Sequence, residues 1–285
     1  NAVNDAPVAT IPPVSYSAAE HSSLTLHGTG LSISDVDAAG SNVQATLSVT
    51  TGTLTASAGS TGVVVSGSGT NTITLTGTLT QINDLLTGNG GATFSYIINS
   101  NAPPASDTLT LLVSDLGNTG SGGTLTSSDT ATINITSVND APTVSITAPS
   151  YSVVQAQSLL LHNTGLSISD PDGNSTSVQV TLSADLGTLT VAAGTTGVSV
   201  SGSGTSSVTL SGTVSQINNL LLGNGGATLS YINDSGSPTA SATLTLAIDD
   251  LGNTGGGNLT ASANVTVNVV PAAAMGSVAV PGVAP

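Results

Sequence analysis

The side chains of this chain that could do chemistry are its carboxylates. The sequence of 285 residues contains 15 Asp and Glu, three His, and no Lys, Arg or Cys, so its formal net charge is -15 at pH 7. Within the chain, the carboxylates can pair only with the His side chains or with a bound cation. Neighbouring carboxylates repel one another unless a cation lies between them, and hard oxygen ligands suit Ca2+. The composition therefore points to calcium as a cofactor.

The same composition excludes several functions. Without Lys and Arg, the chain cannot neutralise the phosphates of nucleic acids or of anionic lipids. Without Cys, it has no disulfide, thiolate nucleophile or Cys-zinc site. The sequence has no Gly-x-Ser-x-Gly motif, and His27 and His162 each stand alone, outside any metal-binding motif. Its longest apolar run, residues 269–275, is far shorter than the roughly 18 residues of a membrane span. We expect no enzyme, no nucleic-acid partner and no membrane insertion.

The acidic residues belong to a sequence repeat with an offset of 135 residues. The motif Asn-Asp-Ala-Pro at residues 4–7 returns at 139–142, and Leu-Ser-Ile-Ser-Asp-x-Asp at 31–37 returns at 166–172. A repeat of this length indicates a whole domain. The acids kept in both copies are Asp5, Asp35, Asp37 and Asp115, which return as Asp140, Asp170, Asp172 and Asp250.

Period-two alternation of apolar residues with Ser and Thr predicts the elements that position these acids. Leu109, Leu111 and Val113 show this alternation, which indicates half-buried strands, and Gly-rich turns follow every 8 to 12 residues. Several short antiparallel strands in each copy predict a β-sandwich. The segment 79–86 breaks the pattern, since its Leu and Ile residues fall at helical spacing before Gly88, and it predicts a short helical turn.

Strand length then separates the acids into two groups. Asp107 and Asp115 flank a strand of about eight residues, which spans roughly 26 Å, so we expect them at opposite poles of the sandwich. The following strand leads back, which places the linker Asn139-Asp140 at the Asp107 pole of the first copy. By symmetry, Asn4 and Asp5 lie at the Asp115 pole.

The two copies differ in which group they keep. The group around Asp115 persists, whereas Glu20 becomes Gln155, Asp84 becomes Asn219 and Asp107 becomes Ala242. A metal site shared across a domain junction predicts this loss, because the final copy has no downstream neighbour. Asp129, which becomes Ala263, does not follow this pattern.

These motifs resemble the cadherin-like tandem repeats of large bacterial surface adhesins. The likeness rests on Asn-Asp-Ala-Pro, on the Asp-x-Asp pair 31 to 33 residues later, and on a strand that ends in Asp-Leu-Gly-Asn. It implies a Ca2+ site at the junction with ligands Glu20, Asn139, Asp140, Asp170, Asp172 and Asp250. In the first copy it implies the corresponding residues Asn4, Asp5, Asp35, Asp37 and Asp115. Animal cadherins also carry an acidic pair in the middle of the upstream domain, which has no counterpart here unless Asp84 or Asp107 substitutes for it. For the Asp-x-Asp pairs, a polar Asx-type turn is the alternative, and Asp249 competes with Asp250 as a ligand.

The sequence therefore predicts an all-β chain of two tandem cadherin-like, immunoglobulin-like antiparallel sandwiches. We expect repeat 1 at residues 1–137, repeat 2 at 138–270 and an extended Pro/Ala-rich tail at 271–285. The function expected is a calcium-stiffened stalk of an extracellular adhesin or a self-assembling filament, at the cell surface or in a secreted matrix. Its partners are adjacent repeats, or neighbouring copies joined head to tail through residues 271–285. A glycan- or protein-binding adhesive module is the alternative.

Overall fold

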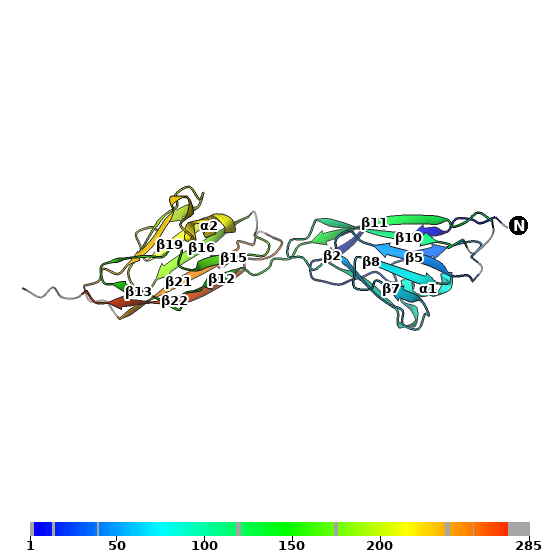
Figure 1. Ribbon diagram of the computed structural model, residues 1–285, viewed down its shortest axis with the longest axis horizontal. Coiled ribbons are helices and arrows are strands. Elements are labelled where there is room, and N and C mark those ends of the chain that lie inside the picture. Colours follow the sequence, from blue (N-terminus) through cyan, green and yellow to red (C-terminus); the bar gives the residue numbers. More distant parts are fainter. Residues whose placement is uncertain are drawn as a thin grey trace, which may run out of the picture. The chain divides into compact units, whose positions relative to one another are not determined.

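The computed structural model describes residues 3–12, 15–38, 40–117, 121–173, 176–236, 240–252 and 254–272. Contacts within the chain divide it into two compact units, unit 1 at residues 1–138 and unit 2 at residues 139–285 (Figure 1). The tail expected at 271–285 falls outside the described residues from position 273 onward. Among the described residues, no helix is both long and apolar enough to cross a membrane.

Unit 1 is a sandwich of one large sheet against two small ones. Its strands are β1 (Val8–Thr10), β2 (Ser15–Ala19), β3 (Leu24–Thr25), β4 (Ser32–Ser34), β5 (Val43–Ser48), β6 (Thr53–Ser57), β7 (Val64–Ser66), β8 (Thr72–Gly77), β9 (Thr93–Ile97), β10 (Ser106–Ser114) and β11 (Thr126–Thr136). The large sheet has the order β2-β11-β10-β5-β8-β7, and the small sheets are β3-β9-β6 and β1-β4. This arrangement confirms the predicted all-β sandwich.

One sheet edge differs from the antiparallel prediction. Strand β2 pairs with β11 in parallel, with Tyr16 opposite Ile133. The reason is that the chain first pairs β1 with β4 in the small sheet and then crosses to the large sheet without reversing. Strand β2 therefore runs in the same direction as β11.

The alternating residues build the core as predicted. In β10, Leu109, Leu111 and Val113 are fully buried, and their neighbours Thr108 and Thr110 point outward because side chains alternate along a strand. Strand β10 pairs with β11 antiparallel from residue 106 to residue 114. Its two ends thus mark the two poles of the sandwich.

The predicted helical turn is α1 (Leu79–Thr87), followed by the 3-10 turn η1 (Asn89–Gly91). Thr78 and Gln81 form a capping box, which satisfies two backbone N–H groups at the helix start. Gly88 ends the helix in the left-handed conformation that other residues rarely adopt.

Unit 2 repeats this topology. Its elements are β12 (Thr143–Ile146), β13 (Ser150–Val154), β14 (Ser158–Leu160), β15 (Leu166–Ser169), β16 (Ser177–Ala184), β17 (Thr188–Ala192), β18 (Ser199–Ser201), β19 (Ser207–Thr213), α2 (Val214–Leu221), η2 (Asn224–Gly226), β20 (Thr228–Ile232), β21 (Ser241–Asp249) and β22 (Thr260–Val270). The large sheet is β13-β22-β21-β16-β19-β18, and the small sheets are β14-β20-β17 and β12-β15. Each unit has its own hydrophobic core.

Candidate metal centre

Asn139, the first residue of unit 2, is held by residues more than 100 positions later in the sequence. The Nδ2 group of Asn139 donates hydrogen bonds to Asp250 Oδ2 at 2.8 Å and to the carbonyl of Gly257 at 3.0 Å. An amide nitrogen carries two hydrogens, so both are used. The amide oxygen Oδ1 is left on the other side, where it is buried and accepts no hydrogen bond.

Asp250 fixes this arrangement at the turn between β21 and β22. It is 2% exposed, and its Oδ1 accepts from the backbone N–H of Gly252 at 2.8 Å and of Leu259 at 2.9 Å. Its second oxygen receives Asn139. Asp250 thus orients Asn139 through a carboxylate that the backbone itself holds in place.

The Asp170-x-Asp172 pair lies beside these residues, directly after β15. Asp172 Oδ2 accepts from the backbone N–H of Asp140 at 3.0 Å, and the N–H of Asp172 donates to Asp170 Oδ1 at 3.3 Å. Burial and then the adjacent Asp172 carboxylate raise the pKa of Asp170 to about 7, with a further contribution from Asp250. The cluster is therefore short of positive charge.

Gly173 lies in close contact with the side chain of Asp170. A Cβ on Gly173 would lie 2.7 Å from Cγ of Asp170, which is closer than two carbon atoms can approach. The Asp170 side chain thus occupies the space that a larger residue at 173 would fill.

Unit 1 shows the same contacts at its own beginning. Asn4 Nδ2 donates to Asp115 Oδ2 at 2.6 Å, and the N–H of Asp5 donates to Asp37 Oδ2 at 3.0 Å. The N–H of Asp37 donates to Asp35 Oδ1 at 3.1 Å. The structure therefore brings together, in each unit, the five residues that the repeat pattern had grouped.

Whether these residues fit a cation can be judged from buried oxygen atoms that receive no hydrogen bond. Among the described residues, such atoms in the two clusters include Asp35 Oδ2, Asn139 Oδ1, Asp140 Oδ2 and Asp172 Oδ1. Native structures rarely leave buried polar atoms unpaired, and an ionised carboxylate needs a donor or a cation. Acidic and amide oxygens of this kind are the ligands that Ca2+ takes, so the residues fit the ion.

Among the described residues of either unit alone, no three His, Asp or Glu ligand atoms lie within 4.8 Å of one another. A Ca2+ ion takes about 6 to 8 oxygens, so it would need amide oxygens, backbone carbonyls and water beside these carboxylates.

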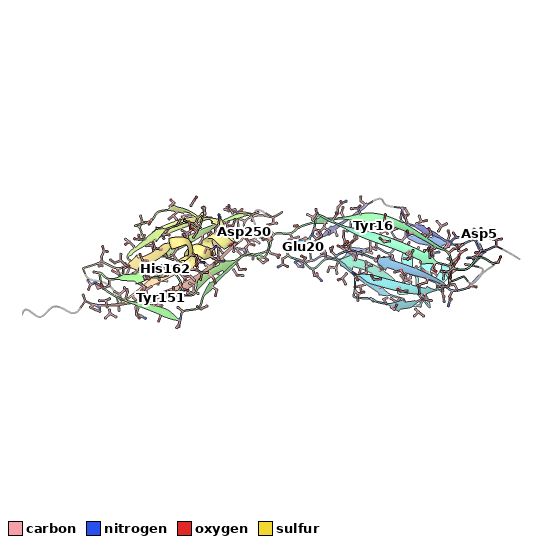
Figure 2. The ribbon with its side chains drawn as sticks, turned by 45° about the horizontal axis from the view of Figure 1, so that its top comes forward. Asp5, Tyr16, Glu20, Tyr151, His162 and Asp250 are labelled. Carbon is pink, nitrogen blue, oxygen red and sulfur yellow. The ribbon has the colours of Figure 1, made fainter. Side chains whose placement is uncertain are left out.

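Glu20 lies at the opposite end of unit 1 from Asp5 (Figure 2). It follows β2, is 1% exposed, and its Oε2 accepts from the N–H of Val138 at 3.0 Å. Its Oε1 lies 3.5 Å from Nε2 of His21, a contact that becomes an ion pair when the His is protonated. Glu20 therefore holds the last residue of unit 1, immediately before Asn139.

Asp107 does not join the other proposed ligands. Its oxygens accept hydrogen bonds from the N–H groups of Thr50, Thr51, Gly52 and Thr108 and from the hydroxyls of Thr51 and Tyr96. Six donors fill the acceptor positions of one carboxylate. The structure thus gives Asp107 a role in fixing the loop after β5, in place of the metal-binding role expected from the sequence.

Asp84 is also separate from the clusters, since it lies on α1 and accepts from Asn89 Nδ2 at 2.8 Å. Both His27 and His162 (the latter labelled in Figure 2) lie against the backbone of the neighbouring strand, at Phe94 and Leu229 respectively.

Sequence reasoning missed Asp185. In unit 2, position 242 is Ala where unit 1 has Asp107, and Asp185 Oδ1 accepts the N–H of Thr243 at 2.7 Å from the facing loop. The carboxylate has moved from the strand to the loop. Aligning the two copies could have revealed this exchange, because the loss of the acid at Ala242 is accompanied by the gain of an acid at Asp185, which corresponds to Thr50.

Comparisons with known proteins identify structural likeness only. No protein-family model and no curated protein matches the sequence. The chain is similar to the protocadherin GammaB4 extracellular domain, with 16% identity, a TM-score of 0.40, and coverage of 94% of this chain and 34% of that one. It is also similar to Drosophila N-cadherin EC1-4, with 14% identity, a TM-score of 0.34, and coverage of 94% and 50%.

An endo-fucoidan hydrolase from glycoside hydrolase family 107 matches with 16% identity, a TM-score of 0.26, and coverage of 94% of this chain and 29% of that one. The chain thus spans 34% of the protocadherin chain and 50% of the N-cadherin chain described above. At TM-scores this low, the likenesses do not decide what the chain binds.

Proposed function

We propose that the chain is a structural extracellular protein, whose sandwiches bind Ca2+ at the residues that begin each unit. The observation that carries this proposal is the set of buried acceptor oxygens without donors at Asn139, Asp140 and Asp172. The chain has no Lys or Arg to satisfy them, whereas one cation from solution can satisfy them together.

The residues proposed as ligands have distinct tasks. Asn139, Asp140, Asp170 and Asp172 offer oxygens, while Asp250 orients the amide of Asn139. The corresponding residues of unit 1 are Asn4, Asp5, Asp35, Asp37 and Asp115. When bound, Ca2+ supplies the positive charge that lets neighbouring carboxylates stay ionised together.

Stiffening of the linker follows from where its backbone is held. The N–H of Val138 is bound by Glu20 of unit 1, and the N–H of Asp140 is bound by Asp172 of unit 2. The backbone N–H groups of the two residues that flank Asn139 are thus each held by a carboxylate. We propose Glu20 as a further ligand, so that Ca2+ loss leaves these acids to repel one another and frees the linker.

The biological setting is proposed from the same chemistry. Extracellular modules bind Ca2+ at about 10⁻⁴ to 10⁻³ M, which suits a surface or secreted matrix. We propose that the units belong to a bacterial adhesin stalk or to a filament in which copies join head to tail or to adjacent repeats.

Calorimetric titration of Ca2+ into the full chain tests the proposal. We expect D172N to weaken binding at unit 2 by about tenfold or more, and D37N to do the same at unit 1, since each variant removes one charged ligand. D84N is the matched control, because Asn219 stands at its position in unit 2. Equal binding by all four proteins, or no heat with the unsubstituted chain, would contradict the proposal.

A further inference from the structure

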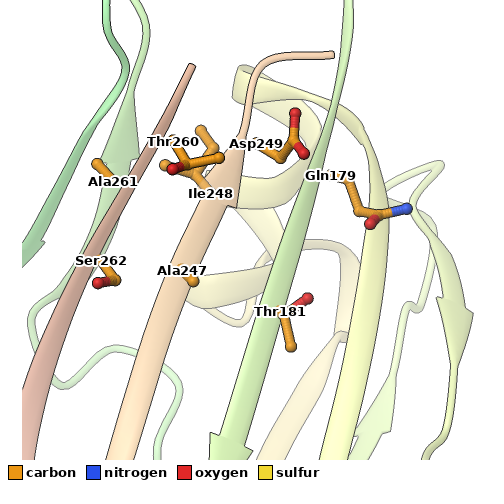
Figure 3. Close-up of a pocket in the computed structure, with 8 residues that line it drawn as sticks. All are labelled: Gln179, Thr181, Ala247, Ile248, Asp249, Thr260, Ala261 and Ser262. Carbon is orange, nitrogen blue, oxygen red and sulfur yellow. The ribbon is translucent and has the colours of Figure 1, made fainter. Parts of the chain in front are cut away.

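The outer face of the large sheet in unit 2 is hollowed over β16, β21 and β22 (Figure 3). The hollow has a volume of about 430 Å³, within the range of small-molecule sites. Six side chains line it from the outer face of these strands: Gln179, Thr181, Ala247, Asp249, Thr260 and Ser262.

Strand register arranges these side chains as two rows of three. Asp249 stands between Gln179 and Thr260, and Ala247 stands between Thr181 and Ser262. Directly opposite residues have Cβ atoms about 4.5–5.5 Å apart, so hydrogen-bonding groups surround a low floor at Ala247.

Unit 1 carries the same six positions with only two differences. The corresponding residues are Gln44, Thr46, Leu112, Ser114, Thr126 and Ser128. Leu112 replaces the floor residue Ala247 and is 41% exposed, so its side chain occupies the space that is open in unit 2. Ser114 replaces Asp249. The two substitutions together open the hollow and add a carboxylate.

The carboxylate of Asp249 supplies one more acceptor than the local turn needs. In unit 1, Ser114 Oγ accepts the N–H of Leu116 at 3.3 Å, and in unit 2 Asp249 Oδ1 accepts the N–H of Leu251 at 2.8 Å. One oxygen of Asp249 thus takes over the structural bond. No residue in the described part of the chain donates to its Oδ2 or bonds to the side-chain amide of Gln179.

We propose that this hollow binds a neutral carbohydrate. Its groups are one carboxylate oxygen, which accepts two hydrogen bonds, and an amide and three hydroxyls, which both donate and accept. Adjacent hydroxyls of a sugar ring present the same mixture of donors and acceptors at similar spacing. The absence of Lys and Arg from the sequence, with the charge of Asp249, favours neutral over acidic sugars.

The hollow is separate from the metal cluster, although Asp249 and Asp250 are neighbours in sequence. Consecutive residues of a strand point to opposite faces, and Asp250 is buried at the turn while Asp249 lines the outer face. Sugar binding at the hollow therefore does not require the metal site.

Saturation-transfer NMR of the full chain with the methyl glycosides of glucose, galactose and mannose, together with an array of neutral oligosaccharides, tests the proposal. We expect signal from at least one probe, equal in Ca2+ and in chelator. The double variant A247L/D249S should lose binding by about tenfold or more. The double variant L112A/S114D should add a second site in unit 1.

Both variants place at each position the residue that the other unit already carries, so the fold is preserved. Failure of every neutral probe to bind, binding that disappears with chelator, or binding unchanged in A247L/D249S would each overturn the proposal. Stronger binding of a lysine methyl ester than of any sugar would also overturn it, since the hollow would then be a cation site.

Discussion

Asp107 shows how one carboxylate can stabilise a fold without a metal. Burial by itself would raise the pKa of Asp107, but the N–H groups of Gly52, Thr50, Thr108 and Thr51 outweigh it and lower the pKa below the ordinary value of 3.8. The folded state thus releases this proton more readily than the unfolded state. Its contribution to stability is complete above about pH 4 and is lost as the pH falls through the lowered value.

We expect D107N to destabilise unit 1 by about 3 kcal/mol at pH 6, because an amide cannot accept from every donor that surrounds the carboxylate. The difference from the unsubstituted chain should shrink at pH 3 and below. Hydrogen exchange measured in the presence of chelator, and resolved for individual peptides, reports the stability of unit 1 separately from that of unit 2. D84N, which should change stability by about 0.5 kcal/mol or less, is the control. A pH-independent effect of D107N would refute this account of the carboxylate.

At the residue scale, the repeat pattern predicted which acids lie together but not the role of each acid. Asp5, Asp37 and Asp115 were grouped because they return together. In the structure, Asp115 binds Asn4 and Asp37 binds the backbone of Asp5. Retention alone cannot distinguish a carboxylate that offers its oxygens from one that caps a loop. Asp107 is of the second kind, and this depends on donors from a loop 56 residues earlier in the sequence.

At the scale of elements, the single helix of each sandwich closes one side of the core. In α1, Ile82, Leu85 and Leu86 are fully buried, at the helical spacing that the sequence showed. We expect L86A to cost about 2–5 kcal/mol, through lost burial and the cavity it leaves.

The matched control is L222A in the turn after α2, whose side chain is 51% exposed, and it should cost about 1 kcal/mol or less. Urea unfolding followed by circular dichroism compares the two variants. Equal losses would show that the helix does not pack as described.

The elements were largely predictable because their periods are local. The alternation of apolar residues in the strands and the glycine that ends the helix, Gly88, are signals that involve only a few neighbouring residues. The parallel pairing of β2 with β11 was not predictable in this way, because it depends on the crossover of the chain between two sheets, with partners more than 100 residues apart.

At the scale of the whole molecule, the sequence repeat both predicts the shared features of the two units and provides the comparison that tests them. Each unit serves as the control for the other, since positions such as 112 and 247 differ while the surrounding register is the same. The hollow of unit 2 was not predictable from the sequence, because it arises from the loss of a side chain and not from a motif.

Small-angle X-ray scattering of the full chain tests the central claim most directly. In millimolar Ca2+, we expect the profile of one rigid particle. In chelator, we expect a broader distribution of interatomic distances, because the freed linker samples many angles. D172N in Ca2+ should resemble the chelated protein, and D84N should resemble the unsubstituted one. Identical profiles with and without Ca2+ would contradict the claim that the ion stiffens the chain.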